Sequence, residues 1–275
     1  MLLFTGRNSI CTQKVLITLF EKGLSFDTKR VDLFTNEQYD PQYLKYNPKG
    51  VVPTLIHNEK PIVESTLICE YLDETFPEPS LVPSSPHERS QMRLWSKHID
   101  EGIFEATREI SFSAMFREKL RNMSDEQRNI RFNNVGDPAR SARFRSTYEH
   151  GTESPYVLFA VASFEKLFRA MEYALSDGRK WLVNSDLTLG DINLMPFVAR
   201  LQYLNLLDLF IDQRQHVQKW FEQAKTVSSY QRAITNMLND EDISTMHSSG
   251  TTIREQIRNR LDEHLANYKL ATHAG

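Results

Sequence analysis

The chain lacks most features that mark secreted, metal-binding or membrane-spanning proteins. Its 275 residues include only two cysteines, Cys11 and Cys69, whose spacing fits neither a disulfide framework nor a metal site. No apolar run approaches the ~20 residues that cross a bilayer. Residues 1–5 are too few and carry no basic residue, so they indicate a first strand and not a signal peptide. From the two cysteines we expect a reduced, cytoplasmic protein without a metal. The net charge of −3 gives no reason to expect a nucleic acid or membrane partner.

The first 80 residues have the pattern of a small α/β domain. We expect strands at residues 2–5, 25–31, 54–57 and 61–63, helices at 11–23 and 64–76, and a polar helix or loop at 36–46. This order, with a parallel first half and a hairpin second half, is typical of a thioredoxin-like α/β layer. Residues 77–86, which are rich in proline and serine, have the composition of a linker.

The remainder, residues 87–275, is predicted to form an all-α domain. Helical periodicity is found at residues 89–120, 156–175, 188–206, 213–227, 229–238 and 251–270. Thr188 and Asp191 have the spacing of a helix capping box. Residues 121–155 are polar, rich in arginine and without a clear period. We interpret this segment as a solvated excursion; the alternative is that it overhangs a site between the domains and meets an anionic substrate.

The string YNPKGVVPTLI at residues 46–56 is the most informative stretch of the chain. Pro53 opens a short apolar strand, where its missing N–H is tolerated only at an edge or at the first position. This placement favours a sharply turned Val52–Pro53 bond, which can be cis. Such a turn would leave the Val52 N–H and C=O free to pair with an extended, peptide-like ligand.

A second feature follows at Glu64 and Ser65. Ser65 precedes an apolar helical run and is predicted to be its N-cap, and the free N–H groups behind a cap attract a carboxylate. Glu64 could pair with an ammonium group. A ligand that holds both charges on one α-carbon, beside a cysteine-like peptide, is a γ-glutamyl peptide such as glutathione. Each feature alone would indicate only a strand start or a helix cap.

The string NPKGVVP at 47–53, followed by Glu64-Ser65, resembles the glutathione-binding motif of cytosolic glutathione S-transferases, and the likeness extends over most of the chain. The strings EKGL at 21–24, ESTLICEYL at 64–72, RSQMRLWSK at 89–97 and MSDE at 123–126 are similar to those of the glutathione-dependent β-aryl etherases of lignin-degrading bacteria. The resemblance implies the two-domain fold of this family and glutathione as co-substrate. It also implies attack of the glutathione thiolate on an aromatic electrophile, releasing a phenol from an ether.

Thiol activation is expected at the start of the first helix, because a free thiol is mostly protonated at neutral pH. We favour Ser9 as the donor to the thiolate, in the register of serine-type transferases. The etherase register places the serine on Thr12 instead, and Asn8 is a third candidate. Cys11 could form a mixed disulfide with glutathione, as in the omega class, although the active cysteine of that class would occupy the position of Ser9.

Further site residues follow from the resemblance and from helical spacing. Gln38 and Lys49 are expected to meet the glycine carboxylate of glutathione, and Asp100 to reach the ligand of a neighbouring subunit in a homodimer. The first long helix carries an apolar stripe of Trp95, Phe104, Phe112, Met115 and Phe116, and we expect at most two of these five to touch the hydrophobic aromatic substrate. Trp95, Phe112 and Phe116 are the favoured candidates.

Two other functions remain open for this scaffold. One is a glutathione-dependent isomerase, lyase or dehalogenase. The other is a regulatory or binding protein that has kept the fold and lost turnover, although intact Val52, Pro53, Glu64 and Ser65 argue against it.

Overall fold

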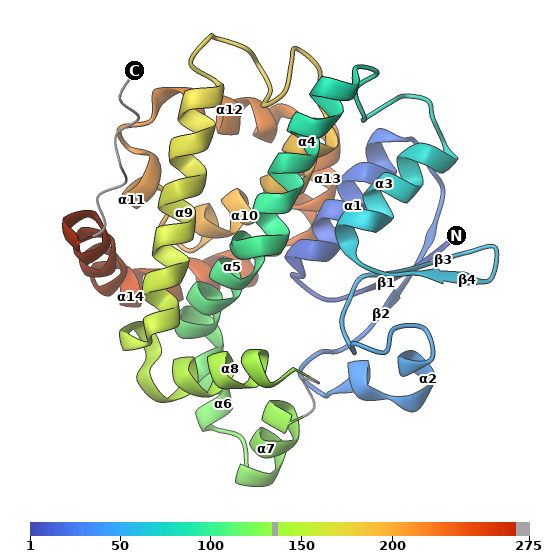
Figure 1. The fold of residues 1–275 in the computed structure, drawn as a ribbon. Helices are drawn as coiled ribbons and strands as arrows, with labels where there is room; N and C mark the ends of the chain where they lie inside the picture. Colours follow the sequence, from blue (N-terminus) through green and yellow to red (C-terminus); the bar gives the residue numbers. More distant parts are fainter. Residues whose placement is uncertain (134–136, 268–275) are drawn as a thin grey trace.

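The computed structural model describes residues 1–133 and 137–267 (Figure 1). The amino-terminal part is one mixed sheet with strand order β2-β1-β3-β4. Its strands are β1 (Leu2–Thr5), β2 (Asp27–Arg30), β3 (Thr54–His57) and β4 (Lys60–Ile62). β1 pairs in parallel with β2 and antiparallel with β3, and β3 and β4 form a hairpin. The predicted thioredoxin-like order is therefore confirmed.

Helices cover both faces of this sheet (Figure 1). On one face, α1 (Ile10–Glu21) and α3 (Ser65–Thr75) pack on fully buried Leu3 and Leu55. On the other face, the 3₁₀ turn Glu37–Tyr39 and α2 (Pro41–Leu44) lie beneath β1, and the Tyr43 and Phe4 rings meet edge-on with their centroids 5.3 Å apart. Because side chains alternate along β1, Leu3 joins the large core that continues into the helical domain, whereas Phe4 belongs to a small core on the opposite face.

The helical domain begins at Pro86 with one long, interrupted helix. It contains α4 (Pro86–His98), α5 (Phe104–Ser111) and α6 (Arg117–Arg121), which are joined by the π-helical turns Ile99–Ile103 and Phe112–Phe116. α9 (Pro155–Ala174) packs along α5, and α10 (Leu189–Tyr203) lies behind them against α1 and α4. Every residue of α10 from 189 to 201 is buried, so this helix is the centre of the domain.

The capping box predicted at the start of α10 is confirmed. The Asp191 carboxylate accepts hydrogen bonds from the Thr188 N–H at 3.3 Å, the Leu182 N–H at 2.9 Å and the Trp220 indole N–H at 2.9 Å. Burial nevertheless raises the pKa of Asp191 to about 6. Asp191 therefore holds the domain core together and lies outside the candidate site.

The polar segment after α6 differs from the predicted excursion, because it folds into α7 (Asp125–Asn133) and α8 (Pro138–His150). The sequence shows no helical periodicity of apolar residues here, because arginine side chains occupy packing positions that aliphatic side chains would usually fill. Their guanidinium groups stack on aromatic rings. Arg128 lies 5.4 Å from the Tyr148 ring centroid, and Arg145 lies 5.0 Å from that of Phe132. The excursion is thus a packed part of the domain.

The carboxyl-terminal part also differs in its boundaries. α11 (Asp208–Ile211) and α12 (Gln215–Thr226) are followed by α13 (Ser228–Ala233), which is shorter than predicted and ends in the 3₁₀ turn Thr235–Met237. The last helix, α14 (Asp240–Asn267), begins eleven residues earlier than the predicted Thr251. Its mostly polar first turns pack on the core through only Ile243 and Met246, which is a weak periodic signal. The predicted end of this helix at residue 270 and of the domain at residue 275 lie outside the described residues. No described helix has the length and apolar character needed to cross a membrane.

Candidate functional site

Three loops meet at Gly6, at the carboxyl end of β1. A Cβ atom on Gly6 would lie 2.9 Å from Val52 Cγ2, 3.3 Å from Leu33 Cδ1 and 3.4 Å from Ser9 Cβ. A larger residue would therefore push these loops apart. Glycine at this position brings the start of α1 and the loop before β3 into contact, so Ser9 and Val52 belong to one site.

The loop before β3 is fixed by polar side chains, and the Val52–Pro53 bond is cis. The Val51 carbonyl accepts hydrogen bonds from the Tyr43 hydroxyl at 2.5 Å and from Asn47 Nδ2 at 2.9 Å. In contrast, the Val52 N–H and C=O make no hydrogen bond to any part of the chain that the structure describes. The Val52 peptide is therefore available to an extended ligand.

The amino terminus of α3 offers a second set of free backbone groups. The structure corrects one assignment, because Glu64 occupies the N-cap position and Ser65 is the first helical residue. Glu64 has a left-handed φ of 66° and makes no side-chain cap bond. The N–H groups of Ser65 and the next two residues precede the first intrahelical bond, from Ile68 to the Glu64 carbonyl. They form the positive end of the helix dipole, where a carboxylate is stabilised.

Three further candidates, Lys49, Glu64 and Gln38, come from the same loops of the amino-terminal domain. Lys49 Nζ lies 2.6 Å from Glu64 Oε1. These two residues were expected to bind opposite ends of the ligand, but here they form an ion pair with each other. Gln38 is buried, and its Oε1 has no partner among the described residues. Gly50 has a φ of 58°, and a Cβ there would lie 2.9 Å from the Tyr39 ring and 3.1 Å from the Gln38 carbonyl oxygen.

The three candidates for thiol activation have different surroundings. Ser9 is the half-buried N-cap of α1, and its Oγ accepts a hydrogen bond from the Thr12 N–H at 3.3 Å, which leaves the hydroxyl hydrogen to donate. Thr12 is 2% exposed, and its hydroxyl accepts from the Gly6 N–H at 3.5 Å. The Asn8 amide already donates to Asp242 Oδ1 at 3.2 Å. This arrangement favours Ser9 as the donor.

The helical domain holds the Arg7–Asn8 loop in place. Asp242, in the first turn of α14, accepts hydrogen bonds from Arg7 at 2.8 Å and from Asn8 at 3.2 Å. The Arg200 guanidinium of α10 donates to the Asn8 carbonyl at 2.6 Å, and burial lowers the pKa of Arg200 to about 10. The sequence analysis missed Asp242 and Arg200, because no local pattern connects residues more than 190 positions from this loop.

Cys11 and Cys69 are free thiols. Cys11 lies beside Ser65 at the contact between α1 and α3; burial raises the pKa of its thiol, although Lys14 and the Ser65 hydroxyl act in the opposite direction. The buried Lys14 ammonium donates to the Thr66 hydroxyl at 2.7 Å, and Thr66 donates to Asp100 Oδ1 at 3.2 Å. Asp100 thus contacts the first turn of α3 within its own chain.

Two of the three residues predicted to face the substrate are buried in the core instead. Trp95 is 8% exposed and belongs to the core between α4 and α10, 3.4 Å from the position of a Cβ on Gly190. Phe112 is 4% exposed and packs on Phe144, with ring centroids 5.5 Å apart. The aromatic stripe therefore faces the core at these positions. Phe116 is half-buried and meets Phe34 of the amino-terminal domain with ring centroids 5.6 Å apart, so it lies at the domain junction.

Within the described residues, no group of three or more His, Cys, Asp or Glu side chains is arranged to hold a metal ion. The polar groups that converge at Gly6 and α3 can instead bind an extended molecule with a carboxylate at one end and a thiol near Ser9. Most of the available donors are backbone N–H groups, and the Ser9 hydroxyl is a further donor.

Comparison with known proteins gives a consistent result for both halves of the chain. The family description "Glutathione S-transferase, N-terminal domain" matches residues 1–74, and "Glutathione S-transferase, C-terminal domain" matches residues 117–223. Protein LigF of Sphingobium sp. is 40% identical over 143 residues, which cover 51% of this chain and 54% of LigF. Glutathione S-transferase 1 of Dianthus caryophyllus is 43% identical over 90 residues, which cover 33% and 41% of the two chains. The chain thus spans about half the length of these curated relatives or less.

Solved structures match over a longer region. The crystal structure of beta-etherase LigF from Sphingobium sp. strain SYK-6 superimposes with a TM-score of 0.75 and 29% identity, over 86% of this chain and 98% of that chain. Glutathione transferase F7 from Populus trichocarpa has a TM-score of 0.67 and 23% identity, over 86% and 99% of the two chains, which is evidence for the fold alone.

Proposed function

The chain belongs to the glutathione S-transferase family, and from that premise we propose that it attacks an aromatic electrophile with the thiolate of glutathione. The favoured substrates are β-aryl ethers of lignin-derived compounds. One observation carries this proposal: Ser9, the free peptide of Val52 and the open amino terminus of α3 follow or precede strand ends that lie at the same end of the sheet. The structural similarity to beta-etherase LigF supports the choice of an ether as substrate.

Each group has a role in binding glutathione. The peptide of the cysteinyl residue pairs with Val52, and the γ-glutamyl carboxylate meets Ser65 and the first N–H groups of α3. Glu64 then turns from Lys49 to the ligand ammonium, while Lys49 and Gln38 meet the glycine carboxylate. This places the thiol at Ser9, whose hydroxyl donates to the thiolate and lowers the thiol pKa.

The reaction is a displacement. The thiolate sulfur attacks the carbon that bears the aryloxy group next to a ketone, and a carbon–sulfur bond forms as the carbon–oxygen bond breaks. The bonding electron pair leaves with the aryloxy oxygen, which takes up a proton to give a phenol, and the other product is a glutathione thioether. The protein contributes proximity and a stabilised thiolate.

Calorimetric titration with reduced glutathione tests the site before any electrophile is chosen. We expect saturable binding that weakens roughly tenfold in Ser65→Ala, because a hydrogen bond to a carboxylate is lost. Ser85→Ala is the matched control, since Ser85 occupies the N-cap position of α4 without a side-chain cap bond. Mass spectrometry of reactions with an α-aryloxy ketone should then detect thioether and phenol in equal amounts.

Other outcomes would point to the alternatives. Return of unchanged glutathione with a rearranged product, or release of halide from an aryl halide, would indicate an isomerase, lyase or dehalogenase. Absence of both heat and thermal stabilisation at millimolar glutathione would contradict the transferase proposal and favour a regulatory protein.

We also propose a cytoplasmic homodimer, in keeping with the reduced cysteines and the family. The face formed by α3 and α4 supports this, because Leu67 and Leu94 are 58% and 50% exposed there. Asp100 would reach the partner's ligand only in such a dimer. Analytical ultracentrifugation of the wild type and of Leu94→Glu tests the proposal, and a wild-type monomer would contradict it.

A further inference from the structure

A buried arginine of the helical domain contacts the loop that leads to Ser9. Arg200 lies on α10, the helix at the centre of this domain, and is only 6% exposed. Its Nη2 donates a hydrogen bond to the Asn8 carbonyl oxygen at 2.6 Å. This carbonyl belongs to the peptide bond that joins Asn8 to Ser9. The guanidinium is therefore placed directly behind the residue that we propose as the donor to the thiolate.

The charge of Arg200 has no counter-ion in the part of the chain that the structure describes. Burial lowers the pKa of Arg200 to about 10, and no described carboxylate raises it again, so the side chain is charged at neutral pH. Asp242, the carboxylate that contacts this loop, bonds instead to Arg7 at 2.8 Å and to the Asn8 amide at 3.2 Å. A buried charge without a counter-ion is costly, and an anion close to it would reduce this cost.

The other charged groups around the site are linked to groups of opposite sign. These links are Arg7 with Asp242, Lys49 with Glu64, and Lys14 with Asp100 through the Thr66 hydroxyl. Since each link contains one positive and one negative group, its two charges largely offset each other at the thiol. Arg200 differs from them because no described group offsets its charge, and because that charge lies in the protein interior.

The proposed reaction forms an anion beside this loop. The thiol of glutathione loses its proton before the attack, so the sulfur at Ser9 becomes negative. A positive charge that is fixed in the interior stabilises such an anion more strongly than the same charge in water, because less solvent screens it. The geometry is set before the ligand binds, since Asn8 has a left-handed φ of 58° and Arg200 holds its carbonyl from α10.

We propose that Arg200 is a positioning residue for this reaction, which holds the Asn8–Ser9 peptide and stabilises the glutathione thiolate through its buried charge. The inference rests on the proposed transferase function and deepens it, because it adds a second source of thiolate stabilisation to the Ser9 hydroxyl. Arg200 needs no contact with glutathione for this role. The helical domain then contributes to the chemistry of the thiol as well as to the binding of the electrophile.

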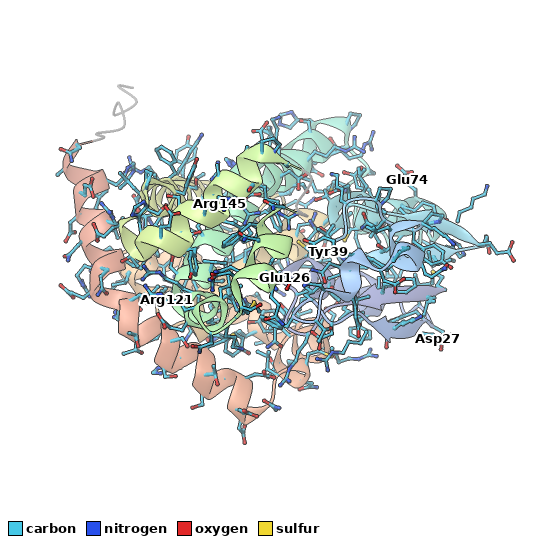
Figure 2. The ribbon with its side chains drawn as sticks, turned by 90° about the horizontal axis from the view of Figure 1, so that it is seen from below. Asp27, Tyr39, Glu74, Arg121, Glu126 and Arg145 are labelled. Carbon is cyan, nitrogen blue, oxygen red and sulfur yellow. The ribbon has the colours of Figure 1, made fainter. Side chains whose placement is uncertain are left out.

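A thiol introduced at position 9 measures this effect without bound glutathione. Ser9→Cys is combined with Arg200→Gln or Arg200→Lys, and the ultraviolet absorbance of the thiolate against pH gives the thiol pKa. The same proteins with Ser9 are the blanks for the two native cysteines. Glutamine keeps a donor for the Asn8 carbonyl but lacks the charge, whereas lysine keeps the charge. Arg121→Gln is the control, because its exposed side chain pairs with Glu118 at the end of α6 (Figure 2).

We expect Arg200→Gln to raise this thiol pKa by about 1, which is roughly a tenfold loss of thiolate at a pH below the pKa. Arg200→Lys and Arg121→Gln should leave it within about 0.3 of the parent value. The thiol of bound glutathione should respond in the same way when Ser9 is present. If thermal melting shows that glutamine impairs folding, Arg200→Met, which buries no amide, replaces it with the same expected rise.

Two results would overturn the inference. An unchanged pKa in Arg200→Gln would show that the hydrogen bond to Asn8 is sufficient and that the charge has no role. An equal rise in Arg200→Gln and Arg200→Lys would show that the shape of the side chain matters and its charge does not. If calorimetry detects no binding of glutathione, the transferase proposal fails, but the thiol at position 9 still tests the effect of Arg200.

Discussion

The wall of the site formed by the amino-terminal domain offers mainly backbone groups, whereas the wall formed by the helical domain offers long side chains. In the first wall, the free peptide of Val52 and the first N–H groups of α3 are set by a cis proline bond and a helix start. In the second, Arg131 of α7 and Phe116 of the turn before α6 both lie beside Phe34, and only tertiary packing brings them there.

Because of this difference, the two walls are suited to recognise different kinds of ligand. Backbone groups fix the position of a peptide-like ligand and tolerate many side-chain changes, provided that glycine and proline are kept where the chain requires them. Side chains on helices can change one at a time without altering the fold. We infer that the first wall holds the invariant reactant, glutathione, and that the second wall sets the choice of electrophile.

The largest effect is expected from a change that disturbs the contact between the two walls. In Gly250→Ala, the new Cβ would lie 1.8 Å from the Leu204 carbonyl oxygen, which is backbone and cannot move aside. α14 would have to shift, and with it Asp242, which holds the Arg7–Asn8 loop. We expect a loss of about 3 kcal/mol in the free energy of unfolding, measured by urea denaturation.

Gly102→Ala is the matched control for this prediction. A Cβ on Gly102 would meet Ser163 Oγ at 3.4 Å, an ordinary contact, so alanine should leave stability within about 1 kcal/mol of wild type. Equal stability of the two variants would show that α14 is not docked through Gly250.

The next effect concerns Ser9, whose hydroxyl we propose as the donor to the glutathione thiolate. Ser9→Ala should raise the thiol pKa of bound glutathione by about 1 to 2, because a hydrogen bond to the thiolate is lost. Ultraviolet absorbance of the thiolate against pH measures this value. Thr12→Ala should leave it unchanged, since Thr12 is buried and bonded to Gly6. A rise in the Thr12 variant alone would transfer the role to Thr12.

The same contrast explains which parts of the protein could be predicted from the sequence. The strands of the sheet, Pro53 and Ser65 were placed correctly to within two residues because turns and helix starts have local signals. The side chains of the second wall have no such local sequence signal. Helical spacing did not reveal that Trp95 faces α10, and the arginine-rich helices stayed hidden because Arg128 and Arg145 pack on rings from distant positions.

A smaller effect is expected at Asp242, which joins the walls through Arg7 and Asn8. Burial opposes ionisation, but hydrogen bonds from Arg7 and Asn8 outweigh it and lower the pKa of Asp242. Because the folded pKa lies below the unfolded one, the stability from this group is present above about pH 4 and is lost as the pH falls. Asp242→Asn should therefore be less stable than wild type at neutral pH, and the gap should close in acid.

Activity provides a second measurement for the Asp242 variant. A loosened Arg7–Asn8 loop should reduce kcat roughly threefold to fivefold, with little change in the affinity for glutathione. Asp240→Asn, an exposed change in the same helical turn, should alter neither kcat nor the pH dependence of stability. If both variants behave alike, the contacts of Asp242 do not position the loop.

The smallest effect should come from the ion pair between Lys49 and Glu64. Both side chains are largely exposed, at 69% and 47%, so the pair contributes less than about 1 kcal/mol to stability. If Lys49 exchanges Glu64 for the glycine carboxylate of glutathione, one exposed pair replaces another, and Lys49→Met should raise Kd only about twofold to fivefold. Added salt should narrow this difference, because exposed charges are screened. Lys45→Met removes a nearby exposed charge whose one side-chain bond within residues 1–133 and 137–267 is to Gln42, and it should leave Kd unchanged. A much larger loss in Lys49→Met would mean that a side chain, and not the backbone, carries the first wall's hold on glutathione.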